Sequence, residues 1–226
     1  MTEGKTLTFL LVREGATDDA LVDVIRKLIE RCAGNAVFAI TGDRRTYRGR
    51  PAAQLEAVRS EGAELPNLVF VHHDSDSRDH TGVEKEIMHA ATTVLGETER
   101  IIPVIPVQET EAWMLADEEL IQSVVGRSEK TYRSREQLKL PPVSRIEETA
   151  SPKEVLRMAL VLAGKEGAKA QKKTKQRFDA HREQLLENIE LDGPIAQLPS
   201  WQRFVVETER AVEACLRDEA GEKLSE

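Results

Sequence analysis

Short apolar runs alternate with amphipathic stretches through the first half of the chain. Four runs are rich in aliphatic residues and short enough for buried strands, at 7–12, 36–41, 68–71 and 101–107. Between them, apolar residues recur at helical spacing from Leu21 to Cys32, from Pro51 to Ser60 and from Val83 to Leu95. Strands that alternate with helices predict an α/β fold, with a mostly parallel four-stranded sheet and helices on both faces. Pro103 and Pro106 cannot donate to a sheet ladder, so the fourth strand should be irregular or lie at an edge.

After about residue 125, the chain has no further strand pattern, and a polar stretch is followed by helical patterns. The polar stretch 126–149 predicts a long connection or an irregular lid. Ser151-Pro152-Lys153-Glu154 has the form of a capping box with proline at the first helical position. Helices are expected at 152–162, 170–187 and 201–215. We therefore expect an α/β domain at 1–125 and a helical C-terminal extension packed on it at 126–226.

The composition is that of a globular chain without a membrane segment. The 226 residues are 40% hydrophobic and 32% charged, and no apolar run reaches the length of a membrane span. The N-terminus has no signal-peptide pattern, and Cys32 and Cys215 lack metal-ligand spacing, so we expect reduced core cysteines in a cytoplasmic protein. The net charge of −8 argues against a chain that coats nucleic acid, but it leaves room for a local basic groove.

Three acidic residues follow predicted strands at their carboxyl ends. Asp74 and Asp76 come after the third strand, where alternation with period two would place them on the same side of the chain. Two such carboxylates repel each other unless a proton or a cation lies between them, and Mg²⁺ prefers oxygen ligands. Glu14 follows the first strand, and parallel sheets bind ligands outside the carboxyl ends of their strands. The alternative is a turn rich in Asp and Ser whose acids are solvated.

Other acidic residues stand where helices are expected to begin. Thr17 is a plausible N-cap with Asp18 and Asp19 in the first helical turn, so we assign these three residues to capping. Glu109 and Glu111 open a short helix after the fourth strand. Their carboxylates either stabilise the helix terminus or join the acidic pocket, and the sequence leaves both interpretations open.

Two basic clusters are candidates for contacts with nucleic-acid phosphates. The residues are Arg44, Arg45 and Arg48 in a loop after the second strand, and Lys169, Lys172 and Lys173 in the helical half. For each cluster taken separately, a solvated surface is the interpretation that the sequence favours.

Three motifs, in this order, resemble the Toprim family. They are Glu14-Gly15-x-Thr17-Asp18 after the first strand, Asp74-x-Asp76 after the third, and Pro106-x-x-Glu109-x-Glu111-Ala112-Trp113-x-Leu115-Ala116-Asp117. The last motif and the segment Ser151-Pro152-Lys153-x-x-Leu156 are similar to those of small Toprim-like proteins that accompany an ATPase in bacterial defence loci. Toprim is the metal-binding fold of topoisomerases, primases and the overcoming-lysogenization-defect nucleases. The resemblance covers about Leu7 to Val212.

The resemblance implies a nuclease that depends on Mg²⁺ or Mn²⁺ and works with an ATPase partner in anti-phage defence. Its substrate would be DNA rather than RNA. Asp74 and Asp76 would bind the metal, and Glu14 would be the general base or a metal ligand. Glu109 and Glu111 would complete a second metal position.

Other classes of function compete with this expectation. The chain lacks the P-loop and the Rossmann glycine motif, and Tyr47 and Tyr132 have no context typical of a topoisomerase nucleophile. A receiver domain would need a lysine after the last strand, where residues 108–111 offer none. A non-catalytic Toprim-like scaffold that binds an ATPase stays open as the alternative.

Overall fold

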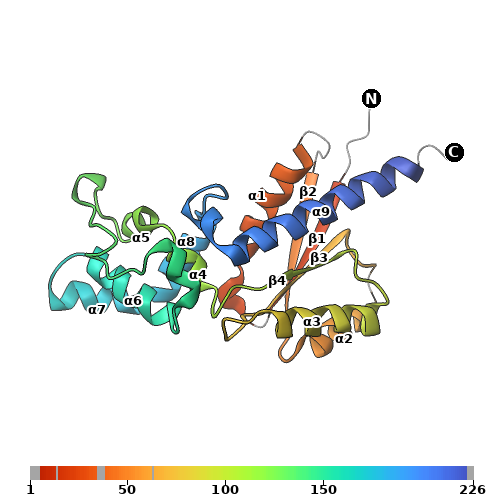
Figure 1. Cartoon of the computed structure of the whole chain (residues 1–226), viewed down its shortest axis with the longest axis horizontal. Coiled ribbons are helices and arrows are strands. Elements are labelled where there is room, and N and C mark those ends of the chain that lie inside the picture. The colour runs from red at the N-terminus through yellow and green to blue at the C-terminus, as the bar shows by residue number, and fades with distance from the viewer. Residues whose placement is uncertain (1–5, 14, 35–38, 63, 223–226) are drawn as a thin grey trace. The chain divides into compact units, whose positions relative to one another are not determined.

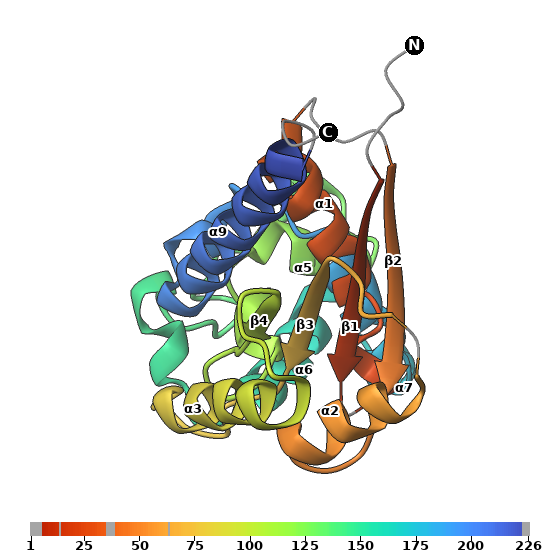
Figure 2. The ribbon, with the colours of Figure 1, turned by 90° about the vertical axis from the view of Figure 1, so that its right-hand side faces the viewer.

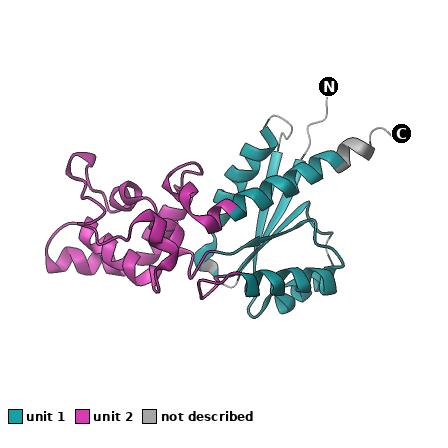
Figure 3. Cartoon of the chain, in the orientation of Figure 1, with its two compact units in different colours: residues 1–73, 81–105, 203–226 teal, residues 74–80, 106–202 magenta. Residues whose placement is uncertain are grey.

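The structure of the chain is a computed structural model that describes residues 6–13, 15–34, 39–62 and 64–222 (Figure 1). The described residues form two compact units (Figure 3). The first contains residues 1–73, 81–105 and 203–226, and the second contains residues 74–80 and 106–202. The boundary that the sequence places near residue 125 stays a prediction.

The first unit is an α/β layer structure. Its elements are β1 (Thr6–Arg13), α1 (Leu21–Ala33), β2 (Ala39–Thr46), α2 (Pro51–Ser60), β3 (Leu68–His72), α3 (Thr81–Ala90), a π-helical turn (Ala91–Leu95) and β4 (Ile101–Val104). The last helix, α9 (Pro199–Glu222), contributes its residues from 203 onward. All strand pairs are parallel, in the order β2-β1-β3-β4, which confirms the predicted fold class and the edge position of the fourth strand.

Helices lie on both faces of this sheet (Figure 2), so alternate residues of the central strands face opposite helical layers. Leu10, Val12, Val69 and Val71 belong to one core with side chains of α2 and α3. On the other face, which α1 and α9 cover, Phe70 lies in an edge-to-face contact with Phe204, at 6.2 Å between ring centroids. Because both faces are covered, β3 is buried along its whole length, as its uninterrupted apolar sequence predicts.

The predicted position of the second strand is wrong in part. Residues 36–38 lie outside the described part of the chain, and β2 runs on through Thr46, so Arg44 and Arg45 belong to a strand and not to a loop. The strand pairs with β1 from Thr6↔Ala39 to Arg13↔Thr46. Most of its side chains are exposed at this edge, so main-chain pairing defines β2 without the apolar pattern by which strands are predicted.

The second unit is helical. Its helices are α4 (Glu111–Met114), α5 (Glu118–Val124), α6 (Pro152–Ala163), α7 (Ala168–Gln176), α8 (Phe178–Glu187) and the first residues of α9, joined by short 3₁₀ turns. Trp113 and Trp201 meet edge to face at 5.1 Å, and Trp113 Nε1 donates to Ser200 Oγ at 2.8 Å. These two buried indoles connect α4 with the start of α9.

Two helix predictions in this half need correction. The single helix expected at 170–187 is broken at Arg177, because α8 is anchored by the buried Phe178 whereas α7 buries none of its residues. Pro152 does stand at the start of α6, but the Ser151 side chain makes no capping hydrogen bond there. The backbone N–H of Lys153, in the first turn of this helix, donates to Glu109 instead.

Candidate functional site

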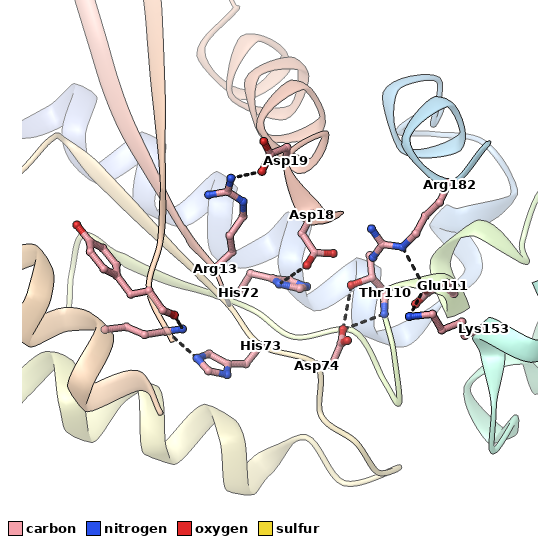
Figure 4. Close-up of polar contacts among 12 residues, drawn as sticks. Arg13, Asp18, Asp19, His72, His73, Asp74, Thr110, Glu111, Lys153 and Arg182 are labelled. Carbon is pink, nitrogen blue, oxygen red and sulfur yellow. Dashed lines mark hydrogen bonds and ion pairs between the residues drawn. The ribbon is translucent and has the colours of Figure 1, made fainter. Parts of the chain in front are cut away.

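A polar cluster lies at the carboxyl ends of β1 and β3 in the first unit (Figure 4). Arg13 is the last residue of β1 and only 4% exposed, and its Nη2 donates to Asp19 Oδ1. His72, the last residue of β3, is also buried, with Nδ1 at 3.9 Å from Asp18 Oδ2. Asp18 and Asp19 thus face side chains of the sheet.

This arrangement corrects the capping assignment for the Asp-rich turn. Residues Ala16–Asp18 form a 3₁₀ turn, and α1 begins only at Leu21 with Ala20 as its N-cap. Thr17 therefore stands before the helix boundary and does not cap it. The interactions with Arg13 and His72 hold the two carboxylates in a turn instead of a helical first turn.

His73 is held by a second buried contact in the first unit. Its Nε2 lies 2.8 Å from Gln54 Oε1, and Gln54 Nε2 donates to Tyr47 O at 2.9 Å. Because the amide nitrogen of Gln54 is used by Tyr47, its oxygen faces the ring, and His73 Nε2 is the donor. The contact joins the residue that follows β3 to α2 and gives His73 a structural role.

The second unit contains the Asp74–Asp76 segment. Asp74 is half-buried, and its Oδ1 accepts from both the backbone N–H and the hydroxyl of Thr110, each at 2.9 Å. Backbone bonds from Ser75 N to Pro106 O and from Asp76 N to Gln108 O, at 3.2 and 3.1 Å, hold the two loops together. Asp74 is therefore oriented within a pair of hydrogen-bonded loops (Figure 4).

Asp76 differs from Asp74 in its backbone and its exposure. β3 ends at His72, and Asp76 has a left-handed φ of 50°, so the chain is no longer extended where the second acid stands. The alternation argument that would place both carboxylates on one side does not apply beyond His72. Asp76 is exposed, at the tip of the same loop as Asp74.

Glu111 and Glu109 are held by contacts within the second unit. Glu111 is 2% exposed, and its Oε1 accepts from Arg182 Nε at 3.0 Å, with Lys153 Nζ at 3.7 Å (Figure 4). Glu109 Oε2 accepts from the backbone N–H of Lys153 at 3.0 Å, in the first turn of α6. Glu109 thus supplies the cap that Ser151 does not, and Glu111 neutralises a buried guanidinium.

Among the residues that the structure describes, no group of three or more His, Cys, Asp or Glu side chains is arranged to hold a metal ion. Glu14, the general base or metal ligand that the resemblance implies, lies outside those residues. Asp74 and Asp76 share a loop, whereas Glu109 and Glu111 are engaged with Lys153 and Arg182.

The two basic clusters differ in their surroundings. Arg44 Nε lies 3.0 Å from Asp19 Oδ2, Arg45 pairs with Asp43 and with Glu61, and Arg48 is exposed. On α7, the three predicted lysines are all exposed, and they are Lys169, Lys172 and Lys173. This helix contains no acidic residue. The lysine helix thus presents uncompensated positive charge, whereas the arginine strand is partly neutralised.

Sequence reasoning missed Arg13 and Arg182. Arg13 falls just past the apolar run that ends at Val12, and Arg182 has no local signal. The available clue to Arg182 was Glu111, which stands among apolar helix residues, because a buried carboxylate needs a cation as its partner. Cys32 and Cys215 are free thiols but half-buried, so the core assignment is wrong for both, and burial raises the pKa of the Cys32 thiol to about 11.

The first unit also has a hollow of about 960 Å³ at the opposite, amino end of the strands. Thr8, Asn67 and Arg100 line it together with Glu97 and Glu99. Sheets of this type bind ligands at the carboxyl ends, where Arg13 and His72 stand, so the hollow does not coincide with the expected position of a site.

None of the described helices is long and apolar enough to cross a membrane.

Comparison with known proteins identifies the family. The family model described as domain of unknown function DUF4276 matches residues 14–208, which include β3, the Asp74–Asp76 loop and the whole helical unit. Neither the curated proteins nor the solved structures gave a match. Since the match spans most of the 226 residues, the chain belongs to the DUF4276 family.

Proposed function

We propose that the protein hydrolyses phosphodiester bonds of nucleic acid with the help of Mg²⁺ or Mn²⁺, as a Toprim-like nuclease. The proposal includes a DNA substrate and an ATPase partner in bacterial defence, both of which come from the motif resemblance. It rests on one local observation above all, the orientation of Asp74 by Thr110.

A carboxylate that accepts two hydrogen bonds at one oxygen has a fixed orientation. Thr110 holds Asp74 Oδ1 with two donors at 2.9 Å, and the paired loops 74–77 and 106–110 hold the backbone on both sides. Fixed outer partners of this kind are typical of ligating carboxylates, because they remove the entropy cost of orienting the ligand. Asp74 is therefore the residue most suited to bind a hard cation in this loop.

The donor set suits Mg²⁺ bound together with a substrate. Mg²⁺ commonly keeps several waters and takes one or two carboxylates plus substrate phosphates, so Asp74 and Asp76 suffice for the protein's share. A divalent cation held by these residues would supply charge neutralisation and would make the attacking water more acidic. Glu14, which follows β1 in the sequence, would accept the proton of the attacking water, and the lysines of α7 would hold the substrate backbone.

A non-catalytic scaffold for an ATPase is the second candidate, and the acidic motif after β4 favours it. Glu109 caps α6 and Glu111 is buried against Arg182, so the most distinctive segment of the resemblance has a structural use in this chain. A scaffold would keep these contacts without needing Glu14 or Asp76. The two candidates therefore differ in which acidic residues matter for activity.

Asp74→Asn and Asp76→Asn are expected to abolish divalent-cation binding while the protein stays folded. The amide oxygen introduced by Asp74→Asn can still accept from Thr110, and removal of like-charge repulsion should slightly raise the stability of the metal-free protein. Changes in outer-shell partners already cost about 10–100-fold in metal affinity, so loss of a ligand should cost at least as much. Titration calorimetry with Mg²⁺ and Mn²⁺ measures the effect.

The matched control for these variants is Asp179→Asn, which removes an exposed carboxylate from the same unit. Unchanged metal affinity in both loop variants would contradict the proposed metal site. Equal loss in the control would show that the calorimetric signal comes from general surface charge.

Reversing Lys172 and Lys173 to Glu should weaken nucleic-acid binding and flatten its salt dependence. Each lost phosphate contact lowers the slope of log affinity against log salt by roughly one unit. Both lysines are exposed on a helix that buries none of its residues, so the fold should survive the change. Fluorescence anisotropy with a labelled oligonucleotide gives the slope, and Lys130→Glu, an exposed lysine of the same unit, is the control. A slope that stays the same in the double variant would assign α7 to solvent or to a protein partner.

A further inference from the structure

Arg13 is a buried cation with unsatisfied donors. Its side chain is 4% exposed, and its contact to Asp19 uses only Nη2. Nε and Nη1 are buried and have no hydrogen-bond partner among the described residues. A buried donor without a partner costs about 1–3 kcal/mol, and more when the group is charged, so an acceptor at these two atoms would be strongly favoured.

The carboxylate beside Arg13 is shared with a second guanidinium. Asp19 Oδ1 accepts from Arg13, while Asp19 Oδ2 lies 3.0 Å from Arg44 Nε. Each oxygen of Asp19 is thus used by a different arginine, and the three side chains carry one excess positive charge. Arg44 is 52% exposed, so the cluster extends from a buried position to the surface of β2.

The position and the chemistry of this cluster fit an oxyanion. Arg13 ends β1, and α1 begins two residues after Asp19, so the positive end of that helix dipole adds to the local field. The several N–H groups of a guanidinium match the oxygens of a phosphate group. Nε and Nη1 are the donors left over after Asp19 has taken Nη2.

We infer that Arg13 and Arg44, bridged by Asp19, form a subsite for a phosphate group of the nucleic-acid backbone. This inference rests on the proposed function for the identity of the ligand, but its geometry depends on the first unit alone. Arg13 Nε and Nη1 bind phosphate oxygens, and Asp19 keeps the two guanidiniums apart and oriented. The main phosphate-binding residue at the carboxyl end of β1 is therefore the buried Arg13, which does not belong to a cluster of basic residues in the sequence.

The competing explanation is a purely structural Arg13. If Arg13 serves only structure, Arg13→Met removes one partner of its pair with Asp19, so it should change stability and leave any ligand response as it is. If Arg13 is part of a phosphate subsite, Arg13→Met should in addition weaken oligonucleotide binding and the stabilisation by phosphate. The two explanations are separated by measuring binding, with stability as an independent readout.

The first experiment measures oligonucleotide binding by anisotropy in EDTA, across a series of chloride concentrations, so that no metal site contributes. Arg13→Met and Arg44→Gln should each lower the slope of log affinity against log salt by roughly one unit. Arg100→Gln, which changes an arginine at the amino end of β4, is the matched control and should leave the slope unchanged. Arg44→Gln keeps the test valid should Arg13→Met fail to fold, because Arg44 is exposed.

The second experiment follows thermal unfolding in inorganic phosphate against chloride at equal ionic strength. Phosphate should raise the unfolding temperature of the wild type and of Arg100→Gln, and it should raise that of Arg13→Met far less. An equal shift in wild type and Arg13→Met, or an unchanged salt slope in both arginine variants, would overturn the subsite. A phosphate effect that needs Arg13, in a wild type that binds no oligonucleotide, would support the subsite and count against the proposed nuclease.

Discussion

Replacing Glu111 with alanine should destabilise the protein by about 3–5 kcal/mol, the usual cost of removing one partner of a buried ion pair. Glu111 and Arg182 are 2% and 4% exposed, with Oε1 and Nε 3.0 Å apart, and the nearby Lys153 is itself a cation that cannot replace the lost carboxylate. At roughly 2–4 °C per kcal/mol for a chain of this size, the unfolding temperature should fall by about 6–20 °C. Thermal and urea unfolding followed by circular dichroism measure this change.

Two controls identify the cause of the expected loss. Replacing both Glu111 and Arg182 with methionine should recover most of the stability, because no buried charge is then left without a partner. Glu154→Gln, which removes one partner of an exposed pair with Arg157, should change stability by less than about 1 kcal/mol. A Glu111→Ala protein as stable as the wild type would mean that the pair with Arg182 does not hold the helical unit together.

The same substitution discriminates between the two roles open to Glu111. Acids gathered for a metal repel one another in the metal-free protein, so their removal should be neutral or stabilising. Removal of an acid that neutralises a buried guanidinium should instead lower the stability of the protein. The sign of the stability change in Glu111→Ala therefore decides whether the second metal position that the resemblance implies can include this residue.

The fold followed from the sequence where strands are buried on both faces and where a residue type restricts the position of a strand. β1 and β3 are covered on both faces and read as continuous apolar runs, and Pro103 placed β4 at an edge. β2 was misplaced because an exposed edge strand is defined by main-chain pairing, which leaves little trace in the order of residue types. The break at Arg177 escaped notice because α7 buries none of its side chains.

The candidate site was predictable only where the chain itself brings residues together. Asp74 was predicted as a site residue from its place after β3, whereas its partner Thr110 was not, although the two meet because the loops after β3 and β4 pair. The partner of Glu111 is Arg182, 71 residues away in sequence, so no local pattern could reveal it. Alternation with period two failed at Asp76, since that rule holds only for extended backbone.

Glu14→Gln should lower divalent-dependent cleavage by about 10²–10⁴-fold if the protein is a nuclease in which Glu14 is the general base. That range corresponds to about 3–5 kcal/mol of activation free energy. Glutamine keeps the shape of the side chain but cannot accept the proton of the attacking water, and it is a poorer ligand for a hard cation. A scaffold, by contrast, would tolerate the change, because it needs no proton acceptor or metal ligand at this position.

The assay uses plasmid and single-stranded DNA with Mg²⁺ or Mn²⁺, in the presence and absence of the ATPase partner, and compares wild type with Glu14→Gln. Thr17→Ala serves as the matched control, since it alters a residue close to Glu14 in the sequence without removing a carboxylate. Unfolding temperature and partner association should be the same in all three proteins, so that only catalysis distinguishes them. Equal cleavage by wild type and Glu14→Gln would assign the activity to a contaminant or to another site. A wild type without cleavage under all these conditions would favour the scaffold, in which the contacts of Glu109 and Glu111 are the reason for the acidic motif.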